Sequence, residues 1–111
     1  MKLAEAIYAL TSAFPADERF GLTSQMRRAS VSVPSNIAEG AARSTKKEFL
    51  HFLIMARGSL SELDTQLALA RRLSFIPESR QADDHLNQTF RLLNGLISAT
   101  RAEIGPLTPN P

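Results

Sequence analysis

The sequence predicts an all-α protein, an antiparallel up-down-up-down four-helix bundle that forms a single domain over residues 1–111. Three observations lead to this fold class. Apolar residues recur at spacings of three and four along most of the chain, which is the period of an amphipathic helix. Strand signals are almost absent, since the only β-branched cluster, Val31-Ser32-Val33, is short and adjoins Pro34. The links between the four expected helices are short, and short links favour antiparallel neighbours.

The first helix is expected from Lys2 to Ala13, because Phe14-Pro15 follows and the residue before a proline is pushed out of the α region. A short connection over residues 16–21 leads to the second helix, expected from Thr23 to about Ala42. Pro34 lies inside this second helix. It removes one backbone hydrogen bond and predicts a kink near Ser30, with a break at Val33 as the alternative.

The third helix has the clearest start, because Thr45-Lys46-Lys47-Glu48 reads as a capping box with Thr45 as N-cap. It is expected to run to about Leu73 and to end at the Phe75-Ile76-Pro77 turn. The fourth helix is expected from about Glu78 to Glu103, continuous through Asn94-Gly95 because its apolar stripe stays in phase. Gly105-Pro106 stops it, and the tail over 105–111 is expected to be loose.

The apolar stripes of these helices predict the core. The expected core residues are, in chain order, Leu3, Ala6, Ile7, Leu10, Leu22, Met26, Ala29, Val33, Ile37, Phe49, Phe52, Leu53, Ala56, Leu60, Leu63, Leu67, Ala70, Leu86, Phe90, Leu93, Ile97 and Thr100. Three further apolar side chains lie off the stripe of the third helix, namely Leu50, Ile54 and Leu69. A helix that is apolar on two sides in a four-helix protein indicates a partner subunit, so these three are the candidate oligomer interface.

Composition excludes several classes of protein. The chain has no Cys, which excludes disulfides and thiolate chemistry and fits the reducing cytoplasm, the expected location. No apolar run approaches the roughly 18 residues of a membrane-spanning helix, so no membrane association is expected. No phosphate-binding loop and no Ser/His/Asp grouping with usable spacing is present. We therefore expect neither catalysis nor a cofactor.

Charge is distributed unevenly along the chain. Residues 19–57 carry seven basic against two acidic side chains, a balance of +5, whereas the rest carries six basic and nine acidic, a balance of −3. This asymmetry predicts one basic region on an acidic body. The candidate contacts to nucleic-acid phosphates within it are Arg27, Arg28, Arg43, Lys46 and Lys47. A solvated surface is the competing interpretation of all five.

Several polar residues near the apolar stripes are expected to have structural roles. Arg27 and Arg28 point about 100° apart on a helix, so one is expected to face solvent or a phosphate and the other to pair with Glu39 or Glu62. Asn36 and Glu39 are expected to satisfy backbone groups freed by Pro34 or to pair with an arginine.

Glu48-x-x-His51 has the spacing of the di-iron motif of ferritin-like bundles, which predicts a metal enzyme as a weaker third hypothesis. Such a site needs this motif on two helices, and a Glu from each of the others. The chain has one such motif, since Asp83-Asp84 and not a Glu three residues back precedes His85. We therefore expect no metal.

A longer pattern points to a known family. The run from Phe14 to Arg43 reads FPADERFGLTSQMRRASVSVPSNIAEGAAR. Together with Glu48-Phe49, Phe52 and the segment over 56–63, it resembles the four-helix-bundle family encoded in intervening sequences of 23S ribosomal RNA genes. It is also similar to the accessory variability protein of diversity-generating retroelements. The resemblance covers nearly the whole chain.

The resemblance implies a bundle that assembles into a homopentamer and has no enzyme activity. For the retroelement relatives it implies binding of nucleic acid and of a reverse transcriptase. Family members begin with a longer first helix that carries a Trp, whereas this chain starts at Met1 within that helix and has no Trp. The first helix is therefore expected to be short, unless the native start lies upstream of Met1.

The leading functional hypothesis is a non-catalytic homo-oligomeric scaffold, with a pentamer favoured by the resemblance, that binds RNA or DNA through the phosphate backbone. The alternative is a protein–protein interaction adaptor whose basic region meets an acidic protein. Salt-dependent binding to random RNA or DNA separates the two.

Overall fold

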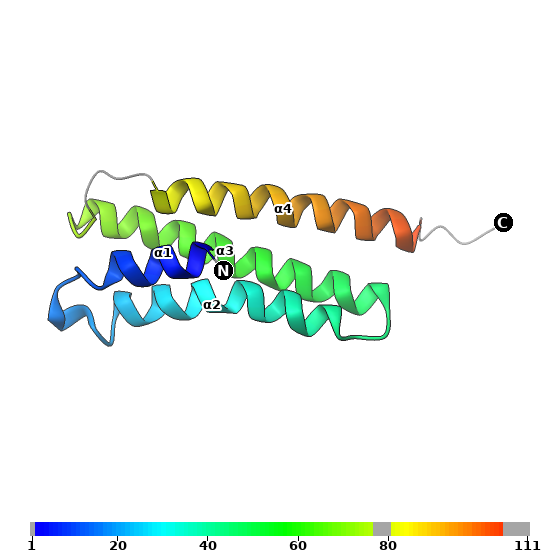
Figure 1. Ribbon diagram of the computed structural model, residues 1–111, viewed down its shortest axis with the longest axis horizontal. Coiled ribbons are helices and arrows are strands. Elements are labelled where there is room, and N and C mark those ends of the chain that lie inside the picture. Colours follow the sequence, from blue (N-terminus) through cyan, green and yellow to red (C-terminus); the bar gives the residue numbers. More distant parts are fainter. Residues whose placement is uncertain (1, 77–80, 106–111) are drawn as a thin grey trace.

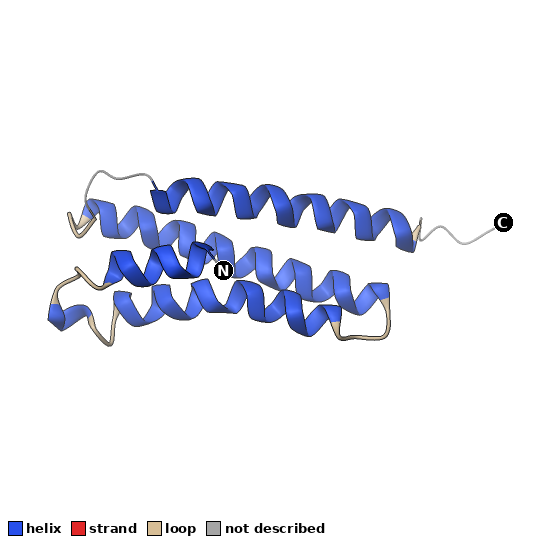
Figure 2. Cartoon of the chain, viewed as in Figure 1, coloured by secondary structure: helices blue, strands red, loops and turns tan. Residues whose placement is uncertain are grey.

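The computed structural model describes residues 2–76 and 81–105, and in that part of the chain it contains helices and no strand. Four α-helices follow one another as α1 (Lys2–Thr11), α2 (Leu22–Ala41), α3 (Lys46–Arg72) and α4 (Gln81–Ile104), with a 3₁₀ turn, η1 (Ala16–Glu18), between the first two. Figure 2 shows that loops occupy only the ends of the bundle. The predicted fold class is confirmed.

The helices pack as a ring of neighbours. α1 contacts α2, α2 contacts α3, α3 contacts α4 and α4 contacts α1, whereas neither diagonal pair packs together in the described chain. Each helix runs opposite to the one before it (Figure 1), which is the predicted up-down-up-down order. None of the helices described is long and apolar enough to cross a membrane.

The core follows the predicted stripes closely. Seventeen hydrophobic side chains are buried, of which Ile7, Met26, Leu53, Leu60, Leu63 and Leu93 are fully inaccessible to solvent. The predicted core residues Leu10, Ile37, Phe49 and Phe90 are only half-buried and pack against the edge of the cluster, and Leu50, predicted at an oligomer interface, does the same.

α1 ends at Thr11, two residues before the predicted Ala13. The hydroxyl of Thr11 donates to the Ile7 carbonyl oxygen at 2.7 Å, and the hydroxyl of Ser12 donates to the Ala9 oxygen at 2.7 Å. The Phe14 amide then donates to the Thr11 oxygen in a turn. Side-chain hydroxyls compete with amides for the last helical carbonyls and help to end the helix early.

α2 passes through Pro34 without interruption, so the alternative of a break at Val33 is wrong. The helix starts one residue before the predicted Thr23 and ends one residue before the predicted Ala42. Burial of the stripe on both sides of Pro34 outweighs the loss of one backbone hydrogen bond, since Ala29 and Val33 are 5% and 2% exposed.

α3 begins with the predicted cap, in which the Thr45 hydroxyl oxygen accepts from the Glu48 amide at 3.1 Å. It ends in a motif that usually contains glycine. Ser74 adopts a left-handed φ of 60°, its amide donates to the Arg71 oxygen, and the Phe75 amide donates to the Ala70 oxygen at 2.9 Å. This is a Schellman arrangement with serine at the left-handed position.

α4 continues through Asn94-Gly95 as predicted. It ends at Ile104, one residue beyond the predicted end, and Gly105 follows with a φ of 81°. The predicted start at Glu78 and the tail after Gly105 lie outside the described residues.

The bundle has four helices in one half and three in the other. α1 has 10 residues and α3 has 27, lengths of about 15 Å and about 40 Å. The N-terminus accordingly lies near the middle of the bundle (Figure 1). We call the part beyond it, where α2 and α3 are joined, the three-helix half.

Gly40 generates the first testable prediction, because α2 passes α3 very closely there. A Cβ added at Gly40 would lie 2.6 Å from Phe52 Cβ and 3.1 Å from Phe49 Cδ1. Gly40→Ala is expected to destabilise the protein by about 1–3 kcal/mol. Gly95→Ala is the matched control, since nothing lies within 4 Å, and should stabilise by about 0.5–1 kcal/mol. Urea unfolding followed by circular dichroism measures both, and equal stability of the two variants would contradict the close approach.

Candidate nucleic-acid interface

Three predicted phosphate contacts come together at the far end of the three-helix half. Arg43 lies in the link between α2 and α3, and Lys46 and Lys47 open α3. The link is tight because Ala41 ends α2 and Thr45 already caps α3. We refer to Arg43, Lys46 and Lys47 as the basic turn. Two of its cations lie at a helix N-terminus, where the helix dipole disfavours positive charge.

Two cations of the basic turn have acidic partners. Arg43 Nη2 lies 2.6 Å from Glu39 Oε1, and its guanidinium carbon lies 4.9 Å from the centre of the Phe52 ring. Lys46 Nζ lies 3.0 Å from Glu103 Oε2. Both pairs are open to water, with the side chains of Arg43 and Lys46 45% and 62% exposed. Lys47 is exposed and has no ion pair with any described residue.

The local charge of this end is therefore smaller than the chain segment suggests. Glu39 and Glu48 belong to the segment itself, but Glu103 comes from the last turn of α4, which folding brings against Lys46. Counting charges along residues 19–57 missed it. The antiparallel order of α3 and α4 was the signal that would have found it, because the end of α4 must return to the start of α3.

A shallow hollow adjoins the basic turn. It is lined by Arg43, Lys47, Glu48, His51 and Phe52. The imidazole of His51 meets the Phe52 ring edge-on, with 5.7 Å between ring centres. His51 was considered only as a metal ligand from the sequence, and its place beside two cations was missed. The described residues contain no group of three or more His, Asp or Glu side chains that could hold a metal ion.

Arg27 has a structural position that the sequence did not predict. Its Nε donates to the Thr11 hydroxyl oxygen at 2.9 Å, and its guanidinium lies 4.7 Å above the centre of the Tyr8 ring. These contacts join α2 to α1. Arg27 is half-buried, so we remove it from the candidate phosphate contacts.

Arg28 is exposed, and with Gln25, Ser59 and Glu62 it lines an open polar hollow between α2 and α3. Neither Arg27 nor Arg28 forms an ion pair with Glu39 or Glu62 in the described chain, so that predicted pairing is wrong. Glu62 instead accepts from Gln66 Nε2 at 3.2 Å. The fifteen residues from Arg28 to Arg43 correspond to about 22 Å of helix, so Arg28 is remote from the basic turn.

The two polar residues near Pro34 have different roles. Glu39 pairs with an arginine, Arg43, as one of the predicted alternatives required. Asn36 donates to the carbonyl oxygen of Ser32 at 2.9 Å and to its hydroxyl at 3.0 Å. Pro34 deprives Ser30 and not Ser32 of a donor, so Asn36 does not repair the proline. The Ser32 hydroxyl also meets that of Ser59 at 2.8 Å, which places all three polar groups between α2 and α3.

The candidate interface residues on α3 differ in exposure. Leu50 is half-buried against the core, whereas Ile54 and Leu69 are 38% and 47% exposed. Ile54 and Leu69 therefore present apolar surface to solvent on the outer side of α3.

Comparison with known proteins identifies the family. The family model described as 23S rRNA-intervening sequence protein matches residues 1–95, and the chain belongs to this family. None of the curated proteins matches the chain.

The exposure of the basic turn generates a prediction about its ion pairs. Exposed pairs contribute little to stability because water and salt screen them. Double-mutant cycles with Gln at Arg43 and Glu39, and at Lys46 and Glu103, should each give a coupling below about 0.5 kcal/mol. Arg71 and Asp83 form the comparison pair, at 2.5 Å and with side chains only 37% and 21% exposed, and should couple more strongly. Urea unfolding at low and high salt measures all three, and stronger coupling at the basic turn than at Arg71 would show that its cations are committed to the fold.

Proposed function

We propose that the protein is a cytoplasmic, non-catalytic, homo-oligomeric scaffold that binds nucleic acid through the phosphate backbone. A pentamer is the assembly favoured by the family resemblance. The observation that carries the proposal is the basic turn, in which three cations within five residues extend from one end of the bundle.

The acidic partners of the basic turn do not prevent phosphate binding. Arg43 and Lys46 meet their glutamates in contact with water, so exchanging a carboxylate for a phosphate oxygen replaces one solvated pair by another. Lys47 needs no such exchange. The unfavourable placement of Lys46 and Lys47 at a helix N-terminus also favours an external anion.

Assembly supplies the affinity that one turn lacks. A ring repeats the three cations once per subunit, and several weak contacts to one polyanion raise the effective concentration of each further contact. Exposed Ile54 and Leu69 support self-association, because exposed apolar surface on a bundle helix indicates a contact with another chain.

Contacts to phosphate are favoured over base recognition by the positions of the aromatic residues. Phe49 and Phe52 near the basic turn are half-buried against the core. Phe20 is 89% exposed, contrary to the packing expected for the aromatics, but it lies in the connection before α2 at the opposite end of the bundle. The basic turn therefore lacks an aromatic platform on which bases would stack.

A protein-interaction adaptor is the second candidate, and the charge balance of the basic turn favours it. Glu39, Glu48 and Glu103 offset the three cations, which weakens long-range attraction for a polyanion. The partner would then be an acidic protein, for which the resemblance suggests a reverse transcriptase.

Self-association has a direct test. We expect the purified protein to have a mass well above the 12.2 kDa of one chain, and five times that mass for a pentamer. Light scattering coupled to size-exclusion chromatography at micromolar concentration measures it. A mass near that of one chain would rule out the scaffold proposal.

Nucleic-acid binding is tested by removing the basic turn. Replacing Arg43, Lys46 and Lys47 by Gln should weaken binding equally for unrelated RNA and DNA sequences. It should also flatten the dependence of log affinity on log salt, because each lost phosphate contact removes about 0.9 from the slope on duplex DNA. Fluorescence anisotropy with labelled duplexes and single strands at several salt concentrations measures both effects.

The matched control replaces three exposed cations outside the basic turn, Lys2, Arg72 and Arg91, by Gln. It removes the same net charge and should retain most of the affinity. Equal losses in both variants would assign binding to net charge and not to the turn. No binding by the unmutated protein even at low salt would favour the adaptor.

A further inference from the structure

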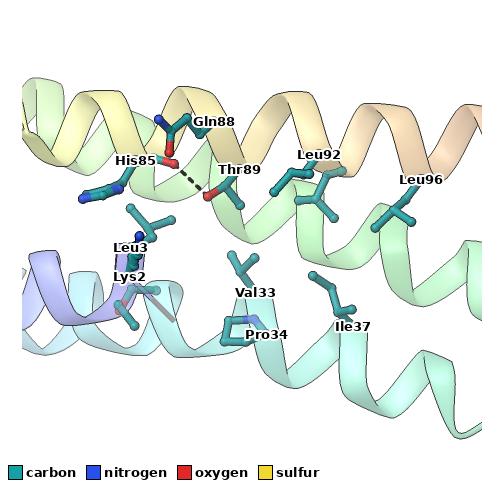
Figure 3. Close-up of a pocket in the computed structure, with 13 residues that line it drawn as sticks. Lys2, Leu3, Val33, Pro34, Ile37, His85, Gln88, Thr89, Leu92 and Leu96 are labelled. Atoms are coloured by element: carbon teal, nitrogen blue, oxygen red, sulfur yellow. Dashed lines mark hydrogen bonds between the residues drawn. The ribbon is translucent and has the colours of Figure 1, made fainter.

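A groove runs along the three-helix half, where the short α1 leaves the fourth position of the bundle uncovered. It has a volume of about 360 Å³ and begins at Lys2 and Leu3 of α1. One wall is α2, with Val33, Pro34 and Ile37, and the other is α4. Figure 3 shows the side chains of Leu92 and Leu96 on α4 directed toward α2 across this groove. We call it the vacant groove.

The vacant groove is apolar and open to solvent. Leu92 and Leu96 are 69% and 40% exposed, the former a large value for a leucine on a bundle helix. α2 and α4 do not pack against each other in the described chain, so neither helix covers the other. About 25 Å of α3 extends beyond the length of α1, which is the length of helix that would complete the bundle.

Both walls of the groove are free of charge. α2 carries no charged residue over 29–38, and α4 carries none over 92–100. The hydroxyl contact between Ser32 and Ser59 and the 3.1 Å hydrogen bond from Arg57 to Asn94 place these two stretches at the same level of α3. Charge depletion around exposed leucines is characteristic of the centre of an interface and not of a solvated surface.

A complementary surface lies on the opposite side of the molecule. The outer side of α3 carries a strip of exposed residues at helical spacing, which we call the outer strip: Ile54, Gly58, Ser61, Thr65 and Leu69. No residue of this strip is charged. From Ile54 to Leu69 it spans about 22 Å, close to the uncovered length of the groove. Its central residues are small, which leaves room for a projecting leucine.

We propose that the vacant groove receives the outer strip of α3 from a second copy of this chain. The inference rests on the proposed homo-oligomer and deepens it by naming the two surfaces that meet. They match in length, in lack of charge and in shape, since Leu92 projects where the strip has Gly58 and Ser61. A partner that buries both surfaces also explains why α3 is apolar on two sides.

The placement of the two surfaces defines the type of assembly. Groove and strip lie on opposite sides of one bundle, because α3 packs between α2 and α4 while the groove opens between those two helices away from α3. Each copy would therefore offer its groove to one neighbour and its strip to another. Contacts of this kind, between two different patches, close into rings when the rotation per subunit permits.

Two single substitutions test the contact. Leu92→Glu places a charge in the groove and Ile54→Glu places one in the strip, and both sites are exposed in the single chain, so circular dichroism should show an intact fold. Each variant alone should sediment as a single chain in analytical ultracentrifugation at a concentration at which the unmutated protein is assembled. Leu73→Glu, at a leucine 47% exposed outside both surfaces, is the matched control and should assemble normally.

Mixing the two variants distinguishes this contact from others. The Leu92→Glu chain keeps its strip and the Ile54→Glu chain keeps its groove, so an equimolar mixture at high concentration should form one intact contact and a 1:1 dimer. Dissociation of Leu92→Glu with normal assembly of Ile54→Glu would indicate a symmetric groove-to-groove contact and would overturn the proposal.

The remaining outcomes also decide. Assembly of both variants as in the unmutated protein, or a mixture that remains monomeric, would overturn the groove-and-strip contact while leaving the homo-oligomer standing. A monomeric unmutated protein would overturn the homo-oligomer and this contact together.

Discussion

Burial of the inner face of α3 is the interaction on which the rest of the structure depends. Leu53, Leu60 and Leu63 are fully buried along this face, and each contributes about 1.5–3 kcal/mol through the hydrophobic effect. α2 and α4 pack on either side of it, and α1 packs against α2 and α4. Because α3 extends over both halves of the bundle, it places the link to α2 at one end and the link to α4 at the other.

Local features then fix the register against α3. Gly40 lets the end of α2 approach Phe49 and Phe52 more closely than a side chain would allow. Lys46 with Glu103, and Arg71 with Asp83, join α3 to α4 at both ends. These contacts add little stability individually, but ion pairs at both ends of one helix pair disfavour a shift by one helical turn.

The sequence was sufficient for the helices and the core because both follow from periodicity, a short-range signal. The Thr45 cap and continuity through Asn94-Gly95 were predictable for the same reason. The Schellman end of α3 was not, because Ser74 stands where glycine is expected. The candidate site was predicted less well, since its charges depend on which helices become neighbours. Arg27 turns toward Thr11, and Glu103 meets Lys46, through contacts that no local pattern encodes.

The brevity of α1 has a consequence for how the chain folds. Ten residues are too few to remain helical alone in water, so α1 is a helix only while it is docked between α2 and α4. Its folding is equivalent to the binding of a ligand that a link of ten residues, from Ser12 to Gly21, tethers to its receptor. The N-terminal segment thus acts as an intramolecular ligand, and it shows that the channel between α2 and α4 accepts a helix wherever one is supplied.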